Sequence, residues 1–287
     1  MRVTVPVRFP RGNPIRPMYR SGRTGKFRIW PLLLFALFFV VYYSSHQETV
    51  PITGRSQLVD MSRQQELALG IQSFQQVLAQ SDIVSVGPEV DFVRKVANLL
   101  TPVIQEADFD WDFRVIRSEQ ANAFALPGGK VAVYTGILPI VENEDGLAAV
   151  LGHEIAHAVA RHGAERLTQQ KLVQWASFAV SASVSDMDYR TQQLVLGALG
   201  AGSQFGVLLP FSRRHESEAD HMGLIYMARA CFDPHEAPRL WERMNAHAGS
   251  GQPLEFVSTH PSATTRIAQF QEWMPEAEKI RDEFCAR

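Results

Sequence analysis

The fold of this chain is organised around one stretch, Gly146-Leu-Ala-Ala-Val-Leu-Gly-His-Glu-Ile-Ala-His-Ala-Val-Ala-Arg-His162. The stretch is rich in Ala, Leu and Val, holds no Pro, and repeats its large apolar residues at helical spacing, which predicts a helix. His153, Glu154 and His157 stand within it in an H-E-x-x-H pattern. Residues four apart share a helix face, so both imidazoles can reach one metal ion, and Glu154 can act on a metal-bound water. This arrangement is typical of a zinc hydrolase.

The same pattern also arises by chance on surface helices. Here the flanking residues are Ala, Val, Ile, Leu and Gly, so the helix is predicted to be buried. Buried His and Glu side chains without partners are costly. The metal-binding interpretation is therefore favoured, and the remaining ligand must come from elsewhere in the chain.

Charge is distributed unevenly along the 287 residues, which have room for one good-sized domain plus appendages. Residues 1–28 form a basic leader with eight of the 28 Lys and Arg residues and no acid. The remainder holds 20 basic and 30 acidic residues. A nucleic-acid partner would need basic residues on the folded part, so we expect no binding to nucleic acid.

An uncharged, apolar segment follows the leader, and Trp30, Tyr42 and Tyr43 resemble interfacial anchors at its ends. A cleaved secretory signal is one interpretation, but no A-x-A-like site follows. An organelle transit peptide is another. We favour an uncleaved transmembrane signal anchor at residues 29–45, which contacts the lipid bilayer and places the following residues across the membrane. The expected location is the bacterial inner membrane, single-pass, with the catalytic domain in the periplasm; the alternative is the mitochondrial inner membrane.

Residues 46–60 are predicted to be a linker, after which Ser62 and Gln65 resemble a capping box that opens a helix. From Trp111 the pattern changes to short alternating runs, which predict a small sheet with a tight turn at 127–129. We expect a strand at Asn122, Ala123 and Phe124 to bind an extended peptide substrate along its backbone. A hairpin that only covers the helices is an equally good interpretation.

Residues 172–212 contain two long uncharged runs with several glycines in the second. A membrane-dipping hairpin or a mobile plug over the site would account for them, but close helix packing through small residues is favoured. Cys231 and Cys285 either form a single bridge or are unrelated thiols, and the sequence leaves this open.

The third metal ligand is predicted on a helix that begins near residue 213. Glu216 and Asp220 are four residues apart and share a face, whereas Glu218 points away from them. A two-histidine zinc site needs one carboxylate from a second helix, and Glu216 is our choice. Asp220 can then accept a hydrogen bond from the outer nitrogen of a ligand histidine. Alone, this segment would be interpreted as a solvated acidic face.

The H-E-x-x-H stretch, combined with Glu216 and Asp220, resembles the gluzincin metallopeptidases of the HtpX and CAAX-prenyl-protease type. The likeness is greatest to Oma-type mitochondrial quality-control peptidases and their bacterial periplasmic counterparts, and it runs from about residue 60 to residue 275. Other similar segments are Asn122–Gly129, Arg161–Arg166 and Ser258–Ser262. No lipobox cysteine stands near residue 45, unlike in the lipoprotein members, which favours a protein anchor.

This resemblance implies a zincin-like α+β domain at residues 61–287, mainly helical, with a small sheet beside the H-E-x-x-H helix. It implies one Zn²⁺ per chain, held by His153, His157 and Glu216, with Glu154 as the base.

Two residues of the C-terminal part also gain roles from the resemblance. His260 would lie over the metal, where it either stabilises an oxyanion or, as a fourth ligand, keeps the enzyme latent. Arg266 would orient that loop or the substrate. The remaining histidines of the folded part lack a partner at a telling spacing and are interpreted as structural. They include His162, His215, His221, His235 and His247.

The sequence therefore predicts a membrane-anchored zinc metalloendopeptidase that cleaves misfolded or membrane-associated proteins in protein quality control. A zinc-dependent chaperone or assembly factor with a latent protease site is the main alternative. An anchored interaction protein with a structural metal is a third.

Overall fold

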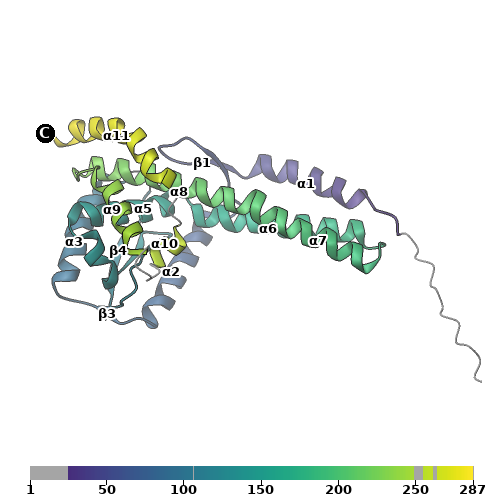
Figure 1. Cartoon of the computed structure of the whole chain (residues 1–287), viewed down its shortest axis with the longest axis horizontal. Coiled ribbons are helices and arrows are strands. Elements are labelled where there is room, and N and C mark those ends of the chain that lie inside the picture. Colours follow the sequence, from purple (N-terminus) through teal and green to yellow (C-terminus); the bar gives the residue numbers. More distant parts are fainter. Residues whose placement is uncertain (1–24, 106, 249–254, 261–263, 287) are drawn as a thin grey trace, which may run out of the picture.

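The computed structural model describes residues 25–105, 107–248, 255–260 and 264–286. The basic leader lies outside the described residues up to position 24. The described chain is mainly helical and holds a small four-stranded sheet, which confirms the prediction of a mainly helical α+β chain with a small sheet. In Figure 1 the sheet and the helices around it form a body from which a helical arm projects.

The helices follow the chain in this order: α1 (Trp30–Ser45), α2 (Arg63–Ala79), α3 (Pro88–Leu100), the 3₁₀ turns η1 (Thr101–Val103) and η2 (Thr135–Ile137), α4 (Leu138–Val141), α5 (Glu144–Val159), α6 (His162–Val184), α7 (Tyr189–Ser203), the π-helical turn η3 (Gln204–Leu208), α8 (Leu209–Arg229), α9 (Glu236–Ala248), α10 (Glu255–Thr259) and α11 (Thr264–Cys285). Helix α2 begins with the predicted capping box: the Gln65 backbone N–H donates to Ser62 Oγ and the Ser62 N–H donates to Gln65 Oε1.

The main sheet has the strand order β3 (Ile83–Val84), β4 (Asp112–Ile116), β6 (Lys130–Tyr134) and β5 (Ala123–Leu126). Strands β4 and β6 are parallel, and the other neighbours are antiparallel. The turn between β5 and β6 contains two glycines at positive φ, Gly128 and Gly129, as a tight hairpin turn requires. Within the described chain, β5 pairs with β6 alone, so it is an edge strand.

Helix α5 lies in the core, and nearly all of its residues are buried. Its first turn is capped by Asn143, whose Oδ1 accepts from the Gly146 N–H. It packs against α8 at Gly152 and Gly223, where a Cβ on Gly223 would lie 2.8 Å from the backbone nitrogen of His153. A side chain at either glycine would push the two helices apart, so these positions hold α8 close to the H-E-x-x-H residues.

The H-E-x-x-H helix ends at Val159, and the chain breaks there before the next helix begins. Arg161 takes the left-handed conformation, with φ 59°, and α6 begins directly after it. Its guanidinium is buried and donates to Glu66, Glu48 and the Met61 carbonyl at 2.5–2.6 Å. These contacts are made to the N-terminal part of the chain and fix the break at this residue.

The expected linker at residues 46–60 is a folded hairpin. Strands β1 (Gln47–Thr49) and β2 (Ser56–Leu58) pair antiparallel, and Val50 and Val59 beside them are buried. The turn of this hairpin supplies Thr53 and Arg55, which reach Glu218 on α8. The segment therefore belongs to the body of the protein.

The arm consists of α6 and α7 with α1 alongside (Figure 1). Trp175 of α6 packs edge-on against Phe38 and Tyr42 of α1. The expected transmembrane segment at 29–45 is thus a helix of 16 residues. Among the described residues, no helix is both long and apolar enough to cross a bilayer. Helix α1, with 16 residues, is shorter than the about 20 residues that a span needs.

A disulfide joins Cys231, just after α8, to Cys285 at the end of α11. The sequence left open whether these two cysteines pair, and the structure shows that they do. It ties together two helices that also pack against each other beside the core.

Candidate metal centre

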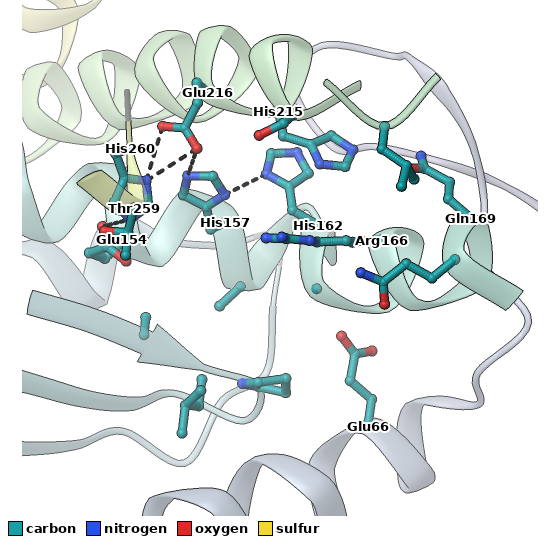
Figure 2. Close-up of a pocket in the computed structure, with 18 of the residues that line it drawn as sticks. Glu66, Glu154, His157, His162, Arg166, Gln169, His215, Glu216, Thr259 and His260 are labelled. Atoms are coloured by element: carbon teal, nitrogen blue, oxygen red, sulfur yellow. Dashed lines mark hydrogen bonds and ion pairs between the residues drawn. The ribbon is translucent and has the colours of Figure 1, made fainter. Parts of the chain in front are cut away.

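Four side chains from three parts of the chain converge in the interior. His153 and His157 come from α5, Glu216 from α8, and His260 follows α10 directly. One ligand atom from each lies within 4.8 Å of all the others. Figure 2 shows His157, Glu216 and His260 turned toward one another. This group includes all three predicted ligands and the histidine predicted to lie over the metal.

The distances between these atoms test whether a metal fits. His153 Nε2 lies 3.1 Å from His157 Nε2 and 3.3 Å from Glu216 Oε2. His260 Nδ1 lies 3.2 Å from His153 Nε2 and 3.0 Å from Glu216 Oε2, and His157 Nε2 lies 3.5 Å from Glu216 Oε1. Ligands around a tetrahedral ion with bonds of about 2.0–2.1 Å are separated by about 3.3 Å. The four groups therefore fit one tetrahedral divalent metal, with His260 in the fourth position.

His153 is held from behind by a buried ion pair. Its Nδ1 lies 3.0 Å from Asp220 Oδ1, and Arg266 donates to both Asp220 oxygens at 2.5 Å. Burial alone would raise the pKa of Asp220, but the Arg266 charge and the His153 hydrogen bond lower it, so Asp220 stays ionised. The Arg266 guanidinium also stacks 3.6 Å from the ring centroid of Trp241. The predicted partners of the site thus form one connected group.

Glu154 lies beside the cluster without joining it. Burial raises its pKa, and the neighbouring His260 and His153 lower it again in part. The backbone amide of Ala125 on β5 adjoins this carboxylate and also lowers its pKa, and His260 Nε2 lies 3.3 Å from Oε1. That contact with His260 is an ion-pair distance without hydrogen-bond geometry, so Oε1 accepts no hydrogen bond among the described residues. A buried carboxylate with a raised pKa suits a group that accepts a proton and returns it.

A cavity of about 420 Å³ opens beside the cluster (Figure 2). Its sheet side is formed by Ala125, Leu126 and Pro127, the end of β5 and the start of the turn. The residues predicted to bind substrate stand just before these, and within the described chain none of them lines the cavity. Ala123 is buried and Phe124 packs against the ring of Tyr134. The edge strand is thus beside the site as predicted, but its later residues face the cavity.

A second group of buried polar residues, interpreted as structural from the sequence, adjoins the first. His162 Nδ1 lies 2.8 Å from His157 Nδ1, and its Nε2 lies 3.0 Å from Glu218 Oε2. Burial lowers the pKa of His162 to about 4. His215 stacks on the His162 ring with centroids 4.3 Å apart and bonds to Glu165 at 2.8 Å. Glu218 points away from the metal cluster, as predicted, and toward this group.

The sequence contains little sign of this second group. His157 and His162 are five residues apart, a spacing that places them on different faces of a continuous helix. They meet because the helix breaks at Arg161. Glu218, the carboxylate that His162 contacts, lies on α8, and it is paired with Arg55 from the β1–β2 hairpin, a segment that we expected to be a linker.

Comparisons with known proteins agree with this geometry. A profile of peptidase family M48 matches residues 91–274. Over 246 residues the chain is 43% identical to the mitochondrial metalloendopeptidase OMA1 of Schizosaccharomyces pombe, covering 84% of this chain and 71% of that protein. It is 32% identical to human OMA1 over 271 residues, covering 88% of this chain and 51% of that protein. It is 26% identical to the beta-barrel assembly-enhancing protease of Escherichia coli over 230 residues, covering 79% and 47%.

Proposed function

The chain belongs to peptidase family M48, and from this we propose that it is a zinc metalloendopeptidase with one ion per chain. His153, His157 and Glu216 hold the ion, and Glu154 is the catalytic base. The observation that carries the proposal is the set of separations of 3.0–3.5 Å among the ligand atoms, next to the buried carboxylate of Glu154. Two imidazoles and a carboxylate form a ligand set that zinc hydrolases use.

The chain's own groups carry most of the reaction. When held by His153, His157 and Glu216, zinc would supply a Lewis acid for the peptide carbonyl and for a water whose pKa it would lower toward neutrality. Glu154 takes the proton from the attacking water and delivers it to the leaving amine. Asp220, with Arg266, keeps His153 oriented through its outer nitrogen. The edge strand at Ala125 offers backbone groups to an extended substrate, which lets the site accept peptides of varied sequence.

His260 holds the enzyme in a latent form in this proposal. Its Nδ1 lies within 3.2 Å of ligand atoms of His153 and Glu216, and its Nε2 lies 3.3 Å from Glu154. A neutral histidine here occupies the position that water needs and covers the base. His260 must therefore leave for cleavage to begin. The alternative role, stabilising the oxyanion, predicts the opposite effect of its removal.

One experiment tests both the role of Glu154 as the base and the role of His260 in latency. Cleavage of unfolded casein by the purified full chain is compared between wild type, Glu154→Gln and His260→Ala, with bound zinc measured in each. We expect slow cleavage by wild type, faster cleavage by His260→Ala, and none by Glu154→Gln, which keeps its zinc. Normal cleavage by Glu154→Gln refutes the base, and slower cleavage by His260→Ala refutes latency. Full zinc occupancy in His157→Ala refutes its ligand role.

The substrates we propose are misfolded or membrane-associated proteins, cleaved in protein quality control. A zinc-dependent chaperone with a latent site is favoured instead if zinc is bound and no variant cleaves. In that case the chain should suppress casein aggregation equally in wild type and Glu154→Gln.

The location we propose is a membrane facing an oxidising compartment. The Cys231–Cys285 bridge supports such a compartment, because disulfides are rare where thiols are kept reduced. The bacterial inner membrane with the body in the periplasm and the mitochondrial inner membrane both satisfy this. Leu33, Leu37 and Val40 of α1 are about two-thirds exposed, which supports contact of this helix with lipid. Flotation with vesicles should carry the full chain, and deletion of residues 29–45 should leave it unbound.

A further inference from the structure

We propose that His162 is a positioning residue for His157, and that the turn of the β1–β2 hairpin holds it in place through Glu218. The inference rests on the proposed function, since it takes His157 to be a metal ligand. It assigns a role in the site to Thr53 and Arg55, which lie outside residues 91–274 that match the family profile.

The first step is the placement of hydrogen atoms between two rings. His157 turns Nε2 toward the other ligands and Nδ1 toward His162 Nδ1, which is 2.8 Å away (Figure 2). One hydrogen atom must lie between these two nitrogens. A histidine that binds metal through Nε2 is neutral and carries its hydrogen on Nδ1. His157 therefore donates, and His162 accepts.

The second step follows from the first. A neutral His162 that accepts at Nδ1 carries its own hydrogen on Nε2. That nitrogen lies 3.0 Å from Glu218 Oε2, a buried carboxylate that can only accept when ionised. Both hydrogen bonds therefore donate in the same direction, from the metal ligand His157 through His162 to the Glu218 carboxylate. Reversing it would leave Glu218 facing a lone pair.

The third step is what fixes Glu218. Thr53 Oγ1 donates to its Oε1 at 2.5 Å, and Arg55 Nε donates to its Oε2 at 2.8 Å. Arg55 also donates to both oxygens of Glu165, at 3.0 and 2.8 Å. The guanidinium therefore bridges two buried carboxylates, and the hairpin turn cannot shift without disturbing Glu218.

The two ligand histidines of α5 are then supported in parallel ways. His153 is backed by Asp220, a carboxylate held by Arg266. His157 is also backed by a carboxylate held by an arginine, but His162 spans the gap between them. Outer groups of this kind fix the orientation of a metal-binding histidine and raise its basicity, and their loss typically lowers metal affinity about 10–100-fold.

The test measures metal binding in the full chain rather than cleavage alone. His162→Phe keeps an aromatic ring against His215 but removes the acceptor, whereas His162→Asn keeps an acceptor oxygen near the position of Nδ1. We expect His162→Phe to lose zinc affinity about 10–100-fold in competition with a chromophoric chelator. His162→Asn should recover most of it. The visible absorption of the Co²⁺-loaded protein should change in His162→Phe and stay near wild type in His162→Asn.

His221→Phe is the matched control, because His221 also bonds to a carboxylate, Glu276 at 2.8 Å, and stacks on an aromatic ring, that of Trp273. It should keep wild-type affinity. If His162→Phe does not fold, Glu218→Gln serves in its place. The amide of the new glutamine has one NH₂ group, which must face a donor in either orientation: the His162 N–H in one, Arg55 or Thr53 in the other. The zinc affinity should therefore fall again.

Two results separate the inference from the proposed function. Wild-type zinc affinity and Co²⁺ spectrum in a folded His162→Phe or Glu218→Gln overturn the role of His162, provided that His157→Ala loses its metal. Retention of metal by His157→Ala overturns the ligand assignment itself. Equal losses in His162→Phe and His162→Asn, with similar falls in unfolding temperature, also overturn the inference, since they indicate packing alone.

Discussion

Replacing Arg161 by alanine removes the contact that fixes the break between α5 and α6. The side chain is 3% exposed and donates to Glu66 at 2.6 Å, to Glu48 at 2.5 Å and to the Met61 carbonyl at 2.6 Å. Glu66 is buried as well, so the substitution leaves a carboxylate in the interior without its partner.

The expected loss is large for a single side chain. Breaking a buried ion pair by removing one partner costs about 3–5 kcal/mol. Burial already raises the pKa of Glu66, and Arg161 opposes that rise. Without Arg161 the carboxylate can protonate, which limits the penalty. We therefore expect a fall of about 3 kcal/mol in the free energy of unfolding of Arg161→Ala.

The assay is equilibrium unfolding in urea, followed by circular dichroism. Arg63→Ala is the control, since Arg63 is 71% exposed and lies 4.0 Å from Glu48; it should change the free energy of unfolding by less than about 1 kcal/mol. Glu66→Gln combined with Arg161→Ala leaves no buried unpaired charge, so the double variant should lose clearly less than the sum of the single losses. A loss below about 1 kcal/mol in Arg161→Ala, or strict additivity, would refute this reasoning.

Three further outcomes are expected. Asp220→Asn should lower zinc affinity about 10–100-fold in a folded protein, because Asp220 orients the ligand His153. Undiminished affinity in a chelator competition would contradict this role. Burial opposes ionisation of Glu165, but hydrogen bonds from neighbouring donors lower its pKa to about 2. Because this pKa is depressed, Glu165 stabilises the folded protein at pH values above 4.5, the usual pKa of a glutamate, and this stabilisation of about 3 kcal/mol is lost as the pH falls toward 2. In Glu165→Gln the urea midpoint should therefore depend less on pH between 4.5 and 2. The same pH dependence as in wild type would count against this assignment. Replacing Cys231 and Cys285 together by serine should cost about 4 kcal/mol for a bridge between residues 54 apart, measured in urea, and a loss under about 1 kcal/mol would argue against an ordered loop-closing role.

Local periodicity was sufficient to predict the parts of the site that lie on regular helices. His153 and His157 share a face of α5, and Glu216 and Asp220 share a face of α8, because residues four apart are neighbours on any helix. The turn at 127–129 could be predicted for a similar reason, since consecutive glycines permit the positive φ of a tight hairpin.

The helix break and its consequences could not be predicted in this way. Arg161 is not a residue that favours positive φ, and it adopts this conformation because carboxylates about 100 residues earlier hold its guanidinium. The position of His162 depends on that break. A pattern of neighbours along the chain carries no information about such long-range ion pairs.

The strand residues that line the cavity, Ala125 and Leu126, differ from those predicted to bind substrate, Asn122, Ala123 and Phe124, by a short step along the strand. A one-residue or two-residue shift along a strand changes which side chains and backbone groups face a neighbouring cavity. The sequence predicts that this strand adjoins the site, but it does not reveal that Ala125 lies beside Glu154, because that depends on where β5 meets α5.

The Cys231–Cys285 bridge keeps the chain in one covalent piece after a peptide bond between the two cysteines is cleaved. It encloses the segment that carries His260 and Arg266. A single cut at any peptide bond between the two cysteines, including one made by a second copy of the enzyme, leaves both fragments covalently joined. Such a molecule migrates as one band on a non-reducing gel and as two after reduction, and each of its new chain ends stays tethered close to the body.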